Sequence, residues 1–182
     1  MKFVAVILAT ALLASACATA PPTLILEAAQ VVPWQTPPRR LLVALPGSTS
    51  IDPIQLGAAL QRELAVCGIE ADIVTDAVNS ELSLEADSME RMVDQRLRQS
   101  RPDGLLLVMP RALRAHSADF KDRVTITYSV VITELTTRKP IFRAAAQFNQ
   151  KLTANAGMQN LGRLLVREMA RAGAMRCPDQ RA

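Results

Sequence analysis

The spacing of apolar residues changes several times along the chain, and these changes constrain the fold more than any single motif. A run of five apolar residues at 41–45 is followed by a stretch in which leucine recurs at every fourth position, at Leu56, Leu60 and Leu64. Such a run is typical of a strand buried on both faces, and the four-residue repeat predicts one apolar face of a helix. Asp52 before Pro53 is a typical helix start, and Gly68 is a typical helix end.

The rest of the chain after residue 68 continues this alternation of strand and helix patterns. We expect strands over 69–75 and 104–109, the latter extending to 115, with a helix over 84–100 between them. A hairpin over 124–133 and 141–149 follows, and a last helix starts at Thr153 or Asn155 and ends at Gly173. Strict alternation in the first hairpin strand places Ile126 and Tyr128 in the core and Thr127 in water.

These elements define the expected topology, which is β-α-β-α-β-β-β-α. Two crossover units place the first three strands parallel in one sheet, and the hairpin extends the sheet antiparallel. A chain of 182 residues is long enough for one ordinary domain. We therefore predict one mixed α/β domain at 39–182, with a five-stranded sheet and three helices.

The N-terminus has the layout of a secretory signal peptide. Lys2 precedes an apolar run at 3–14, which is too short to span a bilayer as a mature helix. The sequence Leu13-Ala14-Ser15-Ala16-Cys17 resembles the lipobox of bacterial lipoproteins, in which the cysteine is lipidated after cleavage. The resemblance implies a signal peptide at 1–16 and a lipid on Cys17. The alternative is a secreted protein cleaved after Ala20, although proline at the next position disfavours that cut.

Residues 17–38 are expected to be the lipidated cysteine and a tether. Five of the 11 prolines fall in this segment, and proline-rich segments form stiff, extended spacers. The alternative is that the apolar residues at 24–26 and 31–32 pack on the domain as a short strand, which Trp34 favours. Ala18 follows the cysteine where enterobacterial sorting would read an aspartate as an inner-membrane signal. By that resemblance we expect anchoring at the outer membrane, facing the periplasm.

The turn of the predicted hairpin carries a family resemblance. Residues 134–144 read Glu-Leu-Thr-Thr-Arg-Lys-Pro-Ile-Phe-Arg-Ala. They resemble the Asp-x-x-Thr-Gly-Lys-x-Val-Trp-x-Ala turn of the TolB N-terminal domain, the curli-secretion lipoprotein and the lipoprotein activators of penicillin-binding proteins. Thr137, Lys139 and Ala144 match this pattern, and Arg138 occupies the position of its turn glycine. The resemblance implies a non-catalytic module that docks on other components of the cell envelope.

Residue types that carry catalysis or bind metals are sparse in this chain. His116 is the single histidine, so we expect no metal site, no cofactor and no enzymatic activity. The serines at 48 and 50 are explained as a loop that caps a helix, and the carboxylates at 81–90 complement a helix dipole. Export excludes nucleic acid as an expected partner. A candidate patch for an anionic partner consists of Arg111, Arg114, His116, Lys121 and Arg123, although a solvated hairpin end explains the same residues.

Two further cysteines remain after the predicted lipid site. Cys67 and Cys177 each follow the end of an expected helix, and the topology places both helix ends at the same end of the sheet. In an oxidising compartment two such cysteines are more often paired than free, so a disulfide is predicted. The alternative is a buried free thiol at Cys67 on the apolar stripe of the first helix.

Three functional classes remain from the sequence. The preferred one is an adaptor or assembly factor of the outer membrane that is anchored to the membrane by its lipid and docks on an envelope protein. The second is a subunit of a secretion or transport complex, and the third is a periplasmic hydrolase that uses His116.

Overall fold

The computed structural model describes residues 23–47, 52–75, 86–115, 123–151 and 154–178. These segments form six strands and three helices. The strands are β1 (Thr23–Val31), β2 (Arg40–Leu45), β3 (Glu70–Thr75), β4 (Gly104–Ala115), β5 (Arg123–Glu134) and β6 (Lys139–Lys151). The helices are α1 (Pro53–Val66), α2 (Ala86–Ser100) and α3 (Ala154–Arg171).

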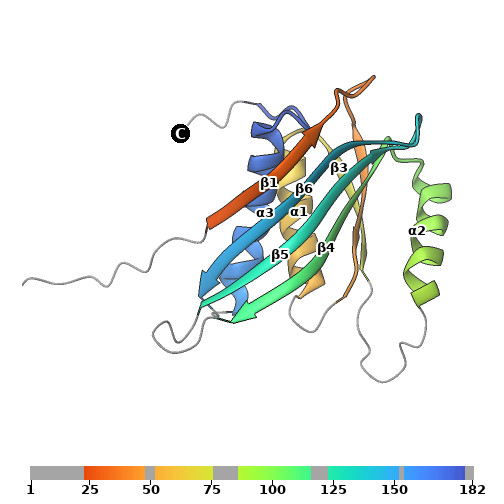
Figure 1. Cartoon of the computed structure of the whole chain (residues 1–182). Coiled ribbons are helices and arrows are strands. Elements are labelled where there is room, and N and C mark those ends of the chain that lie inside the picture. The colour runs from red at the N-terminus through yellow and green to blue at the C-terminus, as the bar shows by residue number, and fades with distance from the viewer. Residues whose placement is uncertain (1–22, 48–51, 76–85, 116–122, 152–153, 179–182) are drawn as a thin grey trace, which may run out of the picture.

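All six strands belong to one mixed sheet in the order β1-β6-β5-β4-β2-β3. The strands β4, β2 and β3 are parallel, and β5, β6 and β1 continue the sheet antiparallel. The parallel trio, the hairpin and the three helices are confirmed. The prediction of five strands is wrong, because the sheet contains a sixth strand, β1, at its edge (Figure 1).

The strand β1 comes from the segment that the sequence analysis assigned to the tether. It pairs antiparallel with β6, with Leu24 opposite Phe148, and Leu24 is buried in the core. The prolines of this segment all lie outside the strand, and none occurs between Thr23 and Val31. Proline has no backbone N–H to donate to a neighbouring strand, so it is tolerated at the ends of an edge strand. The structure therefore differs from a tether through residue 38 and agrees with the alternative of a strand in this segment, which starts at Thr23.

The helices cover the two faces of the sheet unequally. On one face α1 and α3 pack against each other and enclose the main core with the sheet. The helix α2 lies on the opposite face, where it contacts only β2 and β3 (Figure 1). Successive right-handed crossovers that move in opposite directions along a sheet place their helices on opposite faces. Small residues permit the close α1–α3 packing, since a Cβ added at Gly162 would lie 2.6 Å from the Cβ of Ala59.

The predicted signals for the ends of two helices are confirmed. The Asp52 side chain accepts hydrogen bonds from the backbone N–H groups of Ile54 and Gln55 at the start of α1. Gly68 and Gly173 both have positive φ, at 74° and 83°. At both helix ends, the backbone N–H of the glycine and that of the residue after it donate to carbonyl oxygens in the last helical turn. This is the Schellman arrangement. The last helix begins at Ala154, so Asn155 lies inside it and is not its cap.

The segment between β1 and β2 crosses one end of the sheet and is fixed there by Trp34. Its Nε1–H donates to the carbonyl oxygen of Ala174 at 2.7 Å. Its ring lies against Gly104, where a Cβ would be 2.6 Å from the ring atom Cη2. Next to it, the backbone N–H of Gln35 donates to the Glu134 carboxylate at 3.1 Å. The edge strand is thus joined to the C-terminal segment and to the β5–β6 turn.

The β5–β6 turn keeps a left-handed residue without glycine. Arg138 has φ of 56° at the position where the resembling family has its turn glycine. The Thr137 hydroxyl donates to the Glu134 carboxylate at 2.6 Å, and Glu134 is only 5% exposed. The matched residue Thr137 therefore has a structural role, which is to satisfy a buried carboxylate at the end of the sheet.

Candidate functional site

A broad part of the sheet surface has no helix over it. The helices α1 and α3 cover the inner face, and α2 contacts only β2 and β3 on the outer face. Among the described residues, no helix covers the outer face of β4, β5 and β6, which is called the open face below. In β5 the side chains that point to this face are half-buried and largely hydroxylated, namely Thr125, Thr127, Ser129, Val131 and Thr133. The predicted core positions Ile126 and Tyr128 are buried, so the assignment of the two β5 faces is confirmed.

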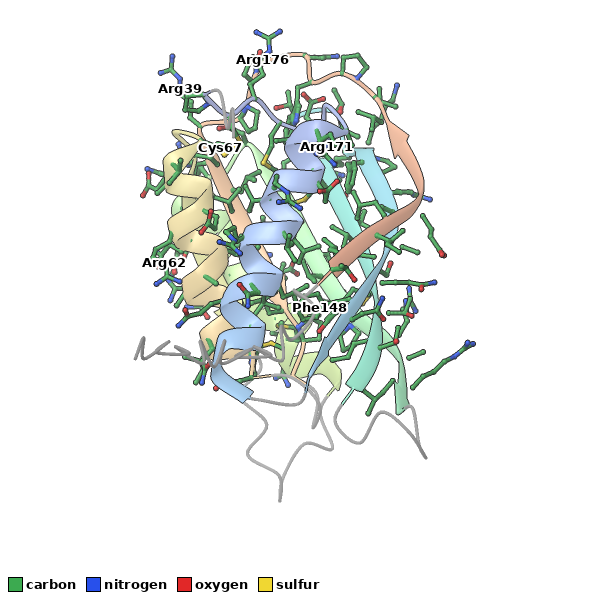
Figure 2. All side chains as sticks on the ribbon, turned by 90° about the vertical axis from the view of Figure 1, so that its left-hand side faces the viewer. Arg39, Arg62, Cys67, Phe148, Arg171 and Arg176 are labelled. Carbon is green, nitrogen blue, oxygen red and sulfur yellow. A yellow bond between two sulfur atoms is a disulfide. The ribbon has the colours of Figure 1, made fainter. Side chains whose placement is uncertain are left out.

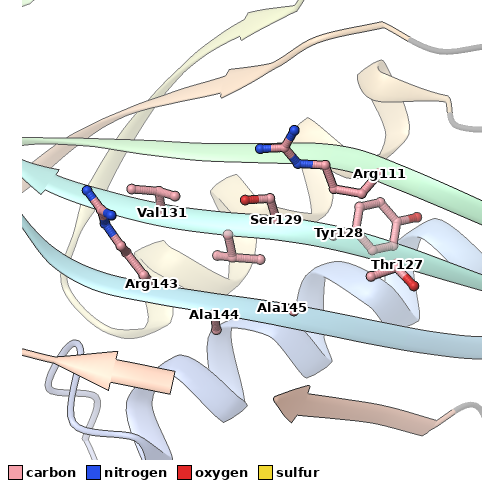
Figure 3. Close-up of a pocket in the computed structure, with 9 residues that line it drawn as sticks. Arg111, Thr127, Tyr128, Ser129, Val131, Arg143, Ala144 and Ala145 are labelled. Atoms are coloured by element: carbon pink, nitrogen blue, oxygen red, sulfur yellow. The ribbon is translucent and has the colours of Figure 1, made fainter. Parts of the chain in front are cut away.

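A shallow hollow of about 470 Å³ lies on this open face. Figure 3 shows Arg111 on β4 and Arg143 on β6 on either side of β5. The outward side chains that line the hollow are Arg111, Thr127, Ser129, Val131, Arg143 and Ala145. The small side chains of the floor leave a wide, flat surface between the two arginines.

Local backbone features place both arginines on this face. Arg143 lies opposite Val131 in the β5–β6 register, and its neighbours Phe142 and Ala144 point into the core. Arg111 occupies a bulge in β4, between the pairs Pro110–Tyr128 and Ala112–Thr127. Both arginines are exposed. Within the described part of the chain, neither guanidinium has an ion-pair or hydrogen-bond partner.

The structure places only part of the predicted basic patch. Arg114 is exposed near the end of β4, in register with Thr125 on the open face, so it shares a strand and a face with Arg111. Arg123 is the first residue of β5. His116 and Lys121 lie outside the described residues. The hollow therefore contains one member of the predicted patch, Arg111, together with Arg143, which the sequence analysis did not select.

A signal for Arg143 was present in the sequence. It alternates with the apolar residues Phe142 and Ala144 in a predicted strand, which places it on the wet face. Counting outward from the pair Glu134–Lys139 would place it beside Val130, and a register shift between Ile132 and Thr133 moves it to Val131. The bulge at Arg111 has no comparable local signal.

The other candidate groups do not add to this site. Glu90 is exposed on α2, and the serines at 48 and 50 lie outside the described residues, as does Cys17. Among the residues with described positions, no three His, Cys, Asp or Glu side chains are grouped so that they could hold a metal ion. In the same part of the chain, no helix has the length and apolar character to cross a membrane.

A disulfide joins Cys67 to Cys177 at the end of the molecule opposite the start of β1. The sulfur atoms are 2.01 Å apart, and the two cysteines are separated by 110 residues in sequence. Cys67 is the C-cap of α1, and Cys177 follows the last turn of α3. Figure 2 shows Cys67 at the end of the molecule where Arg39, Arg171 and Arg176 also lie. The bond thus ties together the ends of the two helices that cover the core.

Comparison with known proteins identifies the fold. No family model matches the chain, and no curated protein matches it. The resemblance to the TolB N-terminal domain therefore stays a prediction. A search of solved structures finds lipoprotein GNA1162 from Neisseria meningitidis, with a TM-score of 0.44 and 16% identity over 75% of this chain and 99% of that one. It also finds the PelC dodecamer from Paraburkholderia phytofirmans, with a TM-score of 0.51 and 11% identity over 86% of this chain and 99% of that one. The described domain thus has a fold similar to that of a PelC chain.

Proposed function

We propose that this protein is a non-catalytic lipoprotein of the outer membrane that docks on other envelope components through the open face of its sheet. The observation that carries the proposal is that β4, β5 and β6 expose one face without a covering helix. The hollow on this face holds two exposed arginines, Arg111 and Arg143, that have no partner among the described residues. A flat surface with exposed arginines is suited to contact with a partner surface of opposite charge.

The lipid on Cys17 is tested by fractionation of cells that carry wild-type protein or Cys17→Ser. We expect wild type in the membrane pellet after a carbonate wash and the variant in the periplasmic fraction, because the lipid is the proposed apolar attachment. Incorporation of an alkyne-labelled fatty acid into wild type alone identifies the modification. A variant that stays in the pellet would show that the domain itself binds the membrane.

Docking through the open face is tested by site-specific photo-crosslinking in the intact envelope. A photoreactive residue at Thr127 lies in the hollow, and one at Arg62 lies on the exposed surface of α1 as the matched control. We expect a discrete crosslinked adduct from position 127 and none from position 62. Adducts of equal yield from both positions would contradict a specific docking face.

A second candidate function is a subunit of an oligomeric secretion or transport complex. The observation that favours it is that the PelC structure with a similar fold is a dodecamer. A ring of identical subunits forms when each subunit contacts the next through two different surfaces. Sedimentation of the detergent-extracted protein separates the candidates, since a monomer or dimer supports the adaptor and a large ring supports the complex.

A further inference from the structure

We infer that the open face binds an extended, acidic segment of a partner protein, which runs along β5 between Arg111 and Arg143. The inference rests on the proposed docking function and specifies the chemistry of its partner. It is based on the placement of two exposed guanidinium groups on opposite sides of one strand, over a floor of hydroxyl and small side chains (Figure 3).

The geometry of the face matches an extended chain. Thr127, Ser129 and Val131 point outward at every second position of β5. Arg111 lies beside Thr127 and Arg143 lies opposite Val131, so the two arginines are offset by four residues along β5. At about 3.3 Å per residue, this offset is roughly 13 Å. An extended peptide has the same rise, and its residues i and i+4 point to the same side, so two carboxylates with that spacing reach both arginines.

The charge of the face favours a negatively charged partner. Arg111, Arg114 and Arg143 are exposed on it. On the described parts of β1, β4, β5 and β6, the acidic side chain on this face is Glu27 of β1, which already accepts a hydrogen bond from Gln147 at 2.8 Å. A guanidinium binds a carboxylate through two parallel hydrogen bonds, which gives both attraction and orientation. Hydroxyls of Thr127 and Ser129 lie between the arginines, where they can donate to the oxygens of the bound segment.

The composition of the face favours a peptide over an anionic glycan. Sugar rings are commonly bound by stacking on aromatic side chains, and the outward positions of the described parts of β1, β4, β5 and β6 include no aromatic residue. Tyr128, Phe142 and Phe148 all point into the core. Val131 and Ala145 provide a smooth apolar floor, and a segment with alternating acidic and small residues can lie flat on it.

The test uses the full mature protein in detergent and two labelled twelve-residue peptides, one of alternating Glu and Ser and one of alternating Gln and Ser. Fluorescence anisotropy at low salt measures binding to wild type, to Arg111→Ser/Arg143→Ser, and to Arg62→Ser/Arg163→Ser. The control pair removes the same charge from exposed positions on α1 and α3. We expect wild type to prefer the Glu peptide and the open-face variant to bind it at least tenfold more weakly. The control should change affinity less than twofold.

Charge reversal provides a test that does not depend on loss of binding alone. We expect Arg111→Glu/Arg143→Glu to lose the Glu peptide and to bind a peptide of alternating Lys and Ser. Equal weakening by the open-face and control pairs would overturn the inference, because it would show binding to net charge only. Tighter binding of oligogalacturonate than of the Glu peptide would also overturn it, in favour of a glycan.

The failure of this inference is distinguishable from the failure of the proposed function. A crosslink from position 127 in the envelope, together with no binding of the Glu peptide, would leave docking intact and remove the acidic segment. Absence of that crosslink would count against docking itself. Thermal unfolding of each variant verifies that the surface substitutions leave the fold unchanged.

Discussion

Replacement of Tyr128 by phenylalanine is expected to stabilise the protein. The Tyr128 side chain is 0% exposed, and its hydroxyl has no hydrogen-bond partner among the described residues. A buried polar group without a partner costs about 1–3 kcal/mol of desolvation, and removal of the oxygen recovers this cost. The ring and its packing stay, and only the van der Waals contacts of one oxygen are lost. We expect the free energy of unfolding to increase by about 1 kcal/mol.

Urea denaturation of wild type and Tyr128→Phe measures the difference, and an unchanged slope of the transition would show that the two unfold in the same way. Destabilisation by about 1 kcal/mol or more would refute the reasoning, because it would show that the hydroxyl is hydrogen-bonded in solution.

Alkaline pH gives a second readout of the same residue. Burial raises the pKa of the Tyr128 hydroxyl above its ordinary value of 10.0. The folded state therefore holds the proton more tightly than the unfolded state does, and the resulting stability is fully present below pH 10 and is lost as pH rises above it. Between about pH 9 and 11, which is one unit on each side of the ordinary tyrosine pKa, the free energy of unfolding should fall less for Tyr128→Phe than for wild type. Parallel pH profiles of the two proteins would contradict this.

Three other perturbations test the fold. Ile126→Asp should reduce the free energy of unfolding by about 3 kcal/mol or more, whereas Thr127→Asp on the open face should change it by about 0.5 kcal/mol; equal losses would mean that both faces of β5 are covered. Cys67→Ser/Cys177→Ser should destabilise by up to about 4–5 kcal/mol in the chain-entropy model, and two freely alkylated thiols in the unreduced wild type would exclude the bond. Trp34→Ala should cost about 3 kcal/mol and increase hydrogen exchange in β1, whereas unchanged exchange would show that Trp34 does not fix the edge strand.

The elements with strong local signals were predictable. Asp52, Pro53 and the leucine repeat define α1 through contacts within one helix and one helix face. The alternation in β5 defines its buried and open faces because one side of the sheet is core and the other is not. These patterns are local, so a short window of sequence contains them.

The elements that were missed depend on distant partners. The strand β1 pairs with β6, and Leu24 and Phe148 are 124 residues apart in the sequence, as the difference of their numbers (148 − 24) gives. The apolar residues at 24–26 and 31–32 left a short strand open as the alternative, but they do not indicate its partner, and the flanking prolines favour a spacer. The hollow depends on Arg111 and Arg143 from two strands that both neighbour β5, and a bulge in β4 sets the position of Arg111. Both features follow from strand register, which the local sequence does not contain.

The incorporation of β1 into the sheet changes how far the domain can extend from the membrane. With the proposed lipid on Cys17, a tether through residue 38 would span up to about 75 Å, whereas the residues from 18 to 22 span at most about 18 Å. The start of β1 lies at the end of the sheet where Thr23, Asn149, Thr125 and Arg114 are aligned across the strands. Under that proposal, this end of the sheet would stay within about 18 Å of the lipid, and the Cys67–Cys177 end would lie farther from the bilayer. The proposed lipoprotein would then work at the membrane surface, and its proposed partner would be embedded in the membrane or be brought to it.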